Sequence, residues 1–313
     1  MKYDLTQARK CIETLDKRRF DRALLGSGDA FRHIVSLVPL LLHLNHPALP
    51  GYVEDAPAGI ADFILSNYQQ NFLSKEHPEL VEDVQSAVNS DAVFGIYVMG
   101  SFGSISQTSA SDLDIWICHQ DDLSEQDQQR LAEKTKKISQ WASTFHVEMH
   151  FYLMTQKRFR NERYSDPLTK ENSGSAQYML LLEEFYRSAV RLSGKPLLWL
   201  HLWVEDEKQY EAEVARLVAE GELNPNDWVD FGGLGQFSAS EYFGASLWQL
   251  YKGIDSPYKS VMKILLLETY AQEYPNAHLI ARQFKEDLLS GRSTAAHHFD
   301  PYIAILERIS QYL

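Results

Sequence analysis

Two short apolar segments, joined by a loop that opens with glycine and serine, constrain this sequence more than any other feature. Val93 to Met99 predicts a buried strand that ends at Gly100-Ser101. After the loop the residues alternate, so that Asp112, Asp114 and Trp116 share one face of a second strand and apolar residues occupy the other. The sequence therefore predicts two neighbouring strands with a pair of carboxylates on one face.

This carboxylate pair predicts a site for metal and phosphate. Side chains two residues apart on a strand lie about 7 Å apart, so Asp112 and Asp114 can bind a divalent metal from one side. The Gly100-Ser101 turn can offer N–H groups and a hydroxyl to phosphate oxygens. An Asp-x-Asp pair can also be only a solvated strand face. The apolar flanks favour interior placement, where two unpaired carboxylates are costly, and hence the functional interpretation.

A third carboxylate is expected on a later strand. The segment His146 to Leu153 alternates, with Glu148 on the same face as His146 and His150. If this strand lies beside the Asp-x-Asp strand, Glu148 completes a set of three carboxylates. The two histidines are then either supporting or substrate contacts, or exposed strand residues.

Length, charge and cysteine content narrow the classes of function. A chain of 313 residues is long enough for a sizeable core and two domains. Its net charge of −13 argues against binding of extended nucleic acid, whereas a small nucleotide with metal-neutralised phosphates fits. Cys11 and Cys118 are too few for a disulfide framework or a Cys-rich zinc site. No stretch reaches membrane-spanning length and the N-terminus does not resemble a signal peptide, so we expect a cytoplasmic protein.

Helical patterns flank the strands on both sides. We expect an N-terminal helical extension over residues 1–88, a domain containing the strands over 89–205 and a C-terminal helical domain over 206–313. Within the middle region we expect a helix over 176–192 and a further strand over 197–204. Ser256-Pro257 predicts a cap and a first-turn proline for a later helix, with Lys259 and Lys263 on one face near its start.

The order of these elements resembles the polymerase-β-like nucleotidyltransferase fold. That fold has a strand, a Gly-Ser turn, an Asp-x-Asp strand, a helix, a strand with a further carboxylate and a helical domain. The resemblance implies an α+β protein with a small mixed sheet. It also implies that Asp112, Asp114 and Glu148 hold two Mg²⁺ ions, for which Mn²⁺ can substitute, one activating a hydroxyl and the other clamping a triphosphate.

A longer resemblance extends over nearly the whole chain and concerns the bacterial class I adenylate cyclases. It is carried by Gly100-Ser101, Ser111 to Trp116, Glu184 to Arg187, Tyr242 to Lys252, Ile254 to Lys259 and Asp29 to Tyr52. The Gly-Ser and Asp-x-Asp motifs alone are typical of the whole superfamily, whereas the aromatic-rich C-terminal segments resemble the cyclases.

This resemblance implies that ATP is converted to cyclic AMP and pyrophosphate by attack of the ribose 3′-hydroxyl on its own α-phosphate. The implied substrate contacts are Gly100, Ser101, Ser111, Trp116, Lys259 and Lys263. The two lysines are expected to hold the triphosphate tail; the alternative is two solvated surface lysines. Members of this family are normally longer, so we expect a C-terminal regulatory domain outside this chain, through which phosphotransferase-system proteins act.

Two other interpretations use the same residues. One is a transferase of the same fold that moves AMP from ATP to an external hydroxyl acceptor. The other is a non-catalytic nucleotide-binding module, against which the intact carboxylate pair argues. The motifs do not separate cyclisation from transfer, and only the family resemblance favours cyclisation.

Overall fold

The computed structural model describes residues 5–86, 91–109, 111–161, 178–290 and 298–312. The strands in these ranges are β1 (Val93–Met99), β2 (Leu113–His119), β3 (Met149–Met154) and β4 (Val190–Gly194), and they form one sheet in the order β3-β2-β1-β4. β1 pairs with β2 and β4 in antiparallel fashion, whereas β2 and β3 are parallel. The predicted α+β architecture with a small mixed sheet is confirmed.

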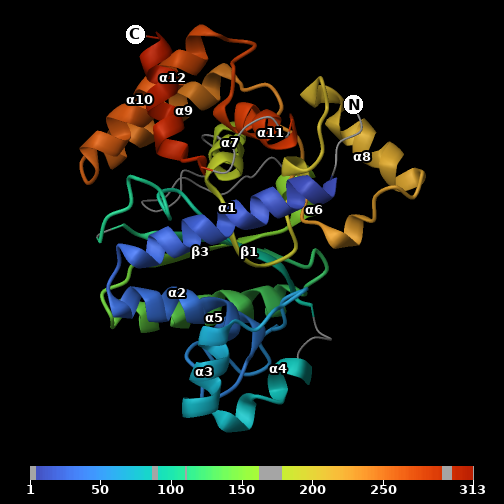
Figure 1. The fold of residues 1–313 in the computed structure, drawn as a ribbon, viewed down its shortest axis with the longest axis vertical. Helices are drawn as coiled ribbons and strands as arrows, with labels where there is room; N and C mark the ends of the chain where they lie inside the picture. Colours follow the sequence, from blue (N-terminus) through green and yellow to red (C-terminus); the bar gives the residue numbers. More distant parts are fainter. Residues whose placement is uncertain (1–4, 87–90, 110, 162–177, 291–297, 313) are drawn as a thin grey trace.

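Helices cover both faces of the sheet (Figure 1). In chain order they are α1 (Leu5–Leu25), α2 (Asp29–His43), α3 (Asn67–Glu76), α4 (Asp83–Ser86), α5 (Glu125–Ser143), α6 (Gln156–Asn161), α7 (Tyr178–Ser188), α8 (Tyr210–Ala219), α9 (Ala239–Lys252), α10 (Pro257–Gln272), α11 (Ile280–Ser290) and α12 (Pro301–Tyr312). Figure 1 shows α2 and α5 on one side of the sheet and α1 with the C-terminal helices on the other.

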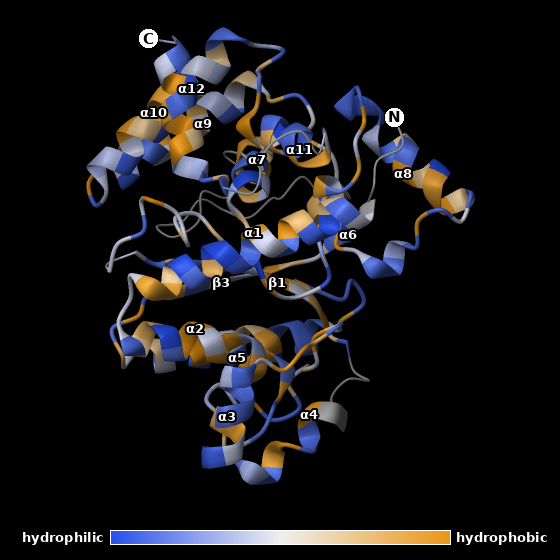
Figure 2. Cartoon of the chain, viewed as in Figure 1, coloured by the Kyte–Doolittle hydropathy of each residue, from blue (hydrophilic) through white to orange (hydrophobic). Residues whose placement is uncertain are grey.

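Strand alternation divides the hydrophobic interior into two clusters. Ile96, Val98 and Ile115 pack with α2 and α5 on one face, while Tyr97 and Trp116 pack with α7 and the C-terminal helices on the other. Apolar residues are prominent in both α2 and α10 (Figure 2). α2 contributes side chains to the first cluster and α10 to the second. Because Asp114 alternates in phase with Trp116, the carboxylate face of β2 is turned toward the C-terminal helices.

The fourth strand differs from the sequence prediction. The expected helix over 176–192 ends at Ser188, and residues 176–177 lie outside the described ranges. The next residues form β4 on β1, and the strand expected over 197–204 is a short 3₁₀ turn at Leu198–Leu200. Gly194 has φ of +88°, and a Cβ there would lie 2.5 Å from the Phe94 carbonyl oxygen. The position of β4 in the sequence therefore depends on how closely its backbone can approach β1. Local periodicity carries no information on that approach.

The predicted helix starts have mixed outcomes. At the start of α9, Ser238 and Glu241 form a capping box. Pro257 begins α10 as expected, but the side chain of Ser256 forms no capping hydrogen bond with that helix. His146 was predicted to lie on the third strand, yet it is an exposed residue with φ of +60° in the turn before β3.

Within the described ranges, every helix is too short or too polar to cross a bilayer.

Candidate active site

The pairing of β2 with β3 brings the predicted carboxylates together at one end of the sheet. Asp114 lies opposite His150 in the parallel register, and the Leu113 N–H donates to the Glu148 carbonyl oxygen at 3.0 Å just before it. Asp112, Asp114 and Glu148 all line a cavity of about 330 Å³ between the sheet and the C-terminal helices. Gly100, Ser101 and Trp116 line the same cavity, together with Lys259 and Lys263 of α10.

Asp114 is the most perturbed carboxylate of this cavity. Burial and the charge of Asp112 raise its pKa to about 6, against the opposing charges of His150, Lys252 and Lys263. Two carboxylates held this close in a partly buried cavity repel each other. A hard divalent cation would relieve that repulsion, and carboxylate oxygens are its preferred ligands. The donor set therefore fits Mg²⁺.

Glu148 lines the cavity but differs from the aspartates in its surroundings. Its side chain is 72 % exposed, and its Oε1 pairs with His150 Nε2 at 3.1 Å. Within the described ranges, no group of three or more histidine, cysteine, aspartate or glutamate side chains is arranged to hold one metal ion. The role of Glu148 as a third metal ligand stays a prediction.

A tyrosine beside the aspartates supports their position. The hydroxyl of Tyr152 on β3 donates to Asp114 Oδ1 at 3.3 Å. This hydrogen bond holds the Asp114 carboxylate in the orientation in which it faces the cavity.

The Gly100-Ser101 turn is held mainly by contacts to the protein itself. Gly100 has φ of +83°, and its N–H donates to Ser188 Oγ at 3.0 Å. The Ser101 carbonyl oxygen accepts hydrogen bonds from the N–H and the hydroxyl of Ser104, at 3.0 and 2.7 Å. The turn is therefore rigid where it borders the cavity, and the Gly100 amide already has a partner.

Trp116 forms part of the cavity floor. Its side chain is 2 % exposed and stacks on Phe185 of α7 with ring centroids 4.1 Å apart. Because the indole is buried and stacked, its role is to shape the cavity and to support β2. Little of the ring face is open to a ligand.

The two predicted lysines of α10 both face the cavity, but they differ in their partners and in the direction of their pKa shifts. Lys263 pairs with Glu184 of α7 at 2.6 Å, and this partner outweighs burial and raises the lysine pKa. Lys259 donates to Ser111 Oγ at 3.4 Å, and burial lowers its pKa against the attraction of Asp112. No ion pair to Lys259 is found among the described residues, so its charge is the more available one for an anionic ligand.

Several further residues line the cavity that local sequence patterns did not place there. Glu184 stood out only within the cyclase-like segment of α7, and its pairing with Lys263 depends on how α7 and α10 pack. Trp248 and Lys252 of α9 also line the cavity, with the Lys252 ammonium 5.5 Å from the Trp248 ring centroid. Tyr302 of α12 reaches the cavity from the end of the chain, and no local pattern could have indicated this.

The fold and the site define a class: an α+β protein in which an aspartate pair at the start of β2 (Asp112 just before the strand, Asp114 on it) and lysines of α10 face one cavity. A family model described as the adenylate cyclase NT domain matches residues 4–200, and one described as the second domain of class-I adenylate cyclase matches residues 237–313. The chain belongs to the class-I adenylate cyclase family.

Curated relatives named adenylate cyclase match along the chain. The one from Haemophilus influenzae is 67 % identical over 100 % of this chain, and the one from Pasteurella multocida is 61 % identical over the same share. The one from Escherichia coli K12 is 44 % identical over 96 % of the chain. The chain spans only 38 % of the length of the first two relatives and 36 % of the third.

A solved spectinomycin adenyltransferase from Enterococcus faecialis is similar to 75 % of this chain, which covers 90 % of that structure. The sequence identity is 14 % and the TM-score 0.35, a likeness too weak to carry an argument.

Proposed function

We propose that this chain is the catalytic portion of an adenylate cyclase, which converts ATP to 3′,5′-cyclic AMP and pyrophosphate. The observation that carries the proposal is one cavity in which Asp112 and Asp114 face Lys259, in a chain that matches adenylate cyclases along its whole length. Family membership favours cyclisation, and the arrangement of charges suits a magnesium triphosphate.

We propose Asp112 and Asp114 as the residues that hold Mg²⁺, with Mn²⁺ as an alternative and Glu148 as a third carboxylate. Bound metal would neutralise charge on the triphosphate and on the departing pyrophosphate. The fit rests on the two carboxylates of one cavity and on the mutual repulsion that raises the pKa of Asp114.

In the proposed reaction the bond from the 3′-oxygen to the α-phosphorus forms as the bond to the β-phosphate oxygen breaks. The hydroxyl proton needs an acceptor, and Glu148 is our candidate because its carboxylate borders the cavity and is solvent-accessible. Pyrophosphate leaves with the electron pair of the broken bond. Catalysis then depends mainly on positioning and on compensation of phosphate charge.

Lys259 is the proposed partner of the triphosphate tail. It lies in the first turn of α10, where free N–H groups also favour anions, and it has no carboxylate partner among the described residues. Lys263 is proposed as a second contact, which requires it to be shared with Glu184.

Incubation of the purified chain with ATP and Mg²⁺, without an acceptor, tests the proposal. Chromatography and mass spectrometry should find cyclic AMP and pyrophosphate in equal amounts, with none from Asp112→Asn. AMP attached to a co-purified molecule, without cyclic AMP, would favour the transferase. Tight ATP binding with no product at all would favour a non-catalytic module.

Glu148→Gln gives a second test within the same assay. Loss of the proton acceptor should lower kcat about 100-fold, with little change in ATP affinity. An unchanged kcat would remove Glu148 from the mechanism while leaving the aspartate assignment in place.

We further propose that the protein acts in the cytoplasm, where its substrate ATP is abundant. The additional length of its relatives supports a regulatory portion beyond this chain, on which phosphotransferase-system proteins would act as the family resemblance implies.

A further inference from the structure

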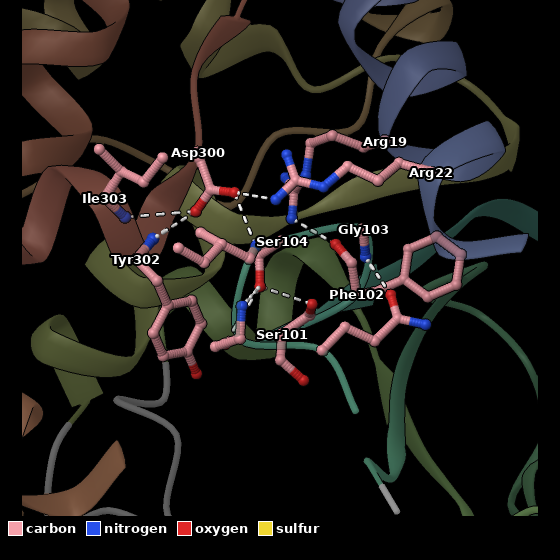
Figure 3. Close-up of polar contacts among 12 residues, drawn as sticks. Arg19, Arg22, Ser101, Phe102, Gly103, Ser104, Asp300, Tyr302 and Ile303 are labelled. Atoms are coloured by element: carbon pink, nitrogen blue, oxygen red, sulfur yellow. Dashed lines mark hydrogen bonds and ion pairs between the residues drawn. The ribbon is translucent and has the colours of Figure 1, made fainter. Parts of the chain in front are cut away.

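The start of α12 contacts the turn that follows β1, although the two segments lie 195 residues apart in the sequence (Figure 3). The contact is made by Asp300, whose side chain is 1 % exposed. Each of its two carboxylate oxygens accepts hydrogen bonds from a different part of the protein, so the side chain joins two elements.

One oxygen of Asp300 caps α12. Oδ1 accepts hydrogen bonds from the N–H groups of Tyr302 at 3.0 Å and Ile303 at 3.3 Å. Pro301 occupies the first helical position, where its missing N–H costs nothing. This half of the interaction is an ordinary helix N-cap.

The other oxygen binds the Gly-Ser turn. Oδ2 accepts a hydrogen bond from the Ile105 N–H at 2.8 Å and a charged one from Arg22 Nη2 of α1 at 2.5 Å (Figure 3). A helix cap does not require these partners. The second oxygen therefore connects α12 and α1 to the turn.

The turn is fixed from its other side by α1. Arg19 Nη2 donates to the Phe102 carbonyl oxygen at 2.8 Å in a buried hydrogen bond. Gly103 has φ of +63°, and a Cβ there would lie 2.2 Å from the Arg19 carbonyl oxygen. The turn thus packs directly on the α1 backbone, and Asp300 completes its enclosure from α12.

This enclosure borders the proposed catalytic cavity. Gly100 and Ser101 line the cavity from the turn, and Tyr302, whose N–H is bound by Asp300, lines it from α12. Movement of Asp300 would displace both walls at once. Asp300 itself does not line the cavity, so any effect on the reaction must pass through the groups that it holds.

We propose that Asp300 is a positioning residue for the reaction, which holds the Gly100–Ile105 turn at the place where substrate phosphate meets it. The inference rests on the proposed function, since the turn needs a fixed position only if it meets a nucleotide. Asp300 lies in the segment that matches the second-domain family model, whereas the turn lies in the segment that matches the N-terminal one. The second segment thereby completes a part of the site that the first segment builds.

Asp300→Asn separates the two roles of the side chain. Asparagine is as good an N-cap as aspartate, so its oxygen can serve Tyr302 and Ile303. Its amide N–H₂ then points at the Ile105 N–H and at Arg22, where donors meet donors. Asp300→Ser is the second variant, because serine also caps helices and is too short to bridge to the turn.

The first measurement is hydrogen exchange of the peptide that spans the turn, followed by mass spectrometry on the whole chain. In both variants this peptide should exchange at least tenfold faster than in the wild type, while the peptides of α12 change little. The second measurement is kinetic: kcat should fall about 10- to 100-fold, as expected when a group near the reacting atoms is misplaced by about 1 Å.

Ser124→Ala is the matched control. Ser124 caps α5 through a 3.1 Å hydrogen bond from the Asp127 N–H and has no contact with the turn. Loss of that cap should lower the melting temperature by about as much as the Asp300 substitutions do. Hydrogen exchange in the Gly100–Ile105 turn and kcat should both stay unchanged. A merely structural role for Asp300 predicts that its variants behave like this control.

The proposal requires both effects in the Asp300 variants. Unchanged exchange in the turn, or wild-type kcat with a loosened turn, would overturn it. If the wild type forms no cyclic AMP, the proposed function fails instead. In that case the exchange rate of the turn and the affinity for Mg²⁺-ATP test the positioning role. That role is overturned if neither quantity differs between the Asp300 variants and the wild type.

Discussion

At the scale of the residue, the site is defined by how neighbouring charges alter one another. Asp114 is ionised less readily than an ordinary aspartate because of burial and Asp112, while the charge on Lys263 is stabilised by Glu184. The same short sequence pattern would leave these groups unperturbed on an open surface. Their environments lead to two predictions.

The first prediction concerns Asp114→Asn and pH. Because the folded-state pKa of Asp114 is raised to about 6, the folded protein binds more protons than the unfolded chain between about pH 4 and 6. The contribution of Asp114 to stability is therefore present below this window and is lost as pH rises through it. Without metal, Asp114→Asn should be more stable than the wild type by about 1–3 kcal/mol at pH 8, with little difference at pH 4.

Denaturant titrations at the two pH values measure this difference. Turnover should be abolished in the same variant, and wild-type Mg²⁺ affinity should increase as pH rises through about 6, since the metal competes with the proton. Equal stabilities of variant and wild type at pH 8 would contradict the proposed repulsion.

The second prediction separates the two lysines. Lys259→Ala should lower kcat/KM for ATP roughly 10- to 100-fold, as expected for loss of a charge-assisted contact, with nearly unchanged melting temperature. Lys263→Ala leaves Glu184, which is 13 % exposed, with only the longer 3.9 Å ion pair to Arg187 and should cost about 1–3 kcal/mol of stability. Thermal unfolding and ATP kinetics of both variants test this, and equal melting temperatures would contradict it.

At the scale of the element, the position of β4 depends on glycine. Gly194 approaches the backbone of β1 with φ of +88°, so that a Cβ would lie 2.6 Å from the Gly95 Cα. The strand is the edge of the sheet and follows directly on α7, which carries Glu184 and Phe185 to the site.

The third prediction is that Gly194→Ala destabilises the protein by roughly 2–4 kcal/mol, the sum of backbone strain and a backbone clash. Gly221→Ala is the control, because Gly221 has φ of +71° with open space around its would-be Cβ. It carries only the strain, about 1 kcal/mol. Chemical denaturation compares the two, and equal losses would mean that close packing of β4 on β1 contributes nothing.

At the scale of the whole molecule, α9 leaves a row of apolar side chains in solvent. Phe243, Leu247 and Leu250 follow helical spacing on α9 and are 69, 51 and 63 % exposed, and Ile254, in the turn after the helix, extends the row at 78 % exposure. A contiguous row of this kind favours association in water more than scattered apolar residues do.

The fourth prediction is that Phe243→Lys with Leu250→Lys reduces self-association of this chain at high concentration, with kcat within about twofold of the wild type. Ile64→Lys is the control, since Ile64 is 84 % exposed but lies outside this row. Light scattering over a concentration series measures the effect. The same dependence on concentration in all three proteins would show that the row does not associate.

The sequence by itself determined the parts of this protein that depend on short-range periodicity. Alternation in residues 113–117 places Asp114 and Trp116 on one strand face, and apolar flanks predict that this face is interior. The order of strands, turn and helix carried the resemblance that implied a small mixed sheet, and the Asp-x-Asp spacing predicted that Asp112 and Asp114 lie together, as they do in one cavity. The shared face of Asp114 and Trp116 follows from the two-residue repeat of a strand.

Only the tertiary structure decided which distant groups meet. The pairing of Lys263 with Glu184, the capture of the Ile105 amide by Asp300 and the formation of β4 each join segments that have no local relation. Such contacts arise from the packing of whole helices and strands, in which a shift of one turn exchanges every partner. A carboxylate or an ammonium group is readable in the sequence, but its partner, its burial and its pKa belong to the folded chain.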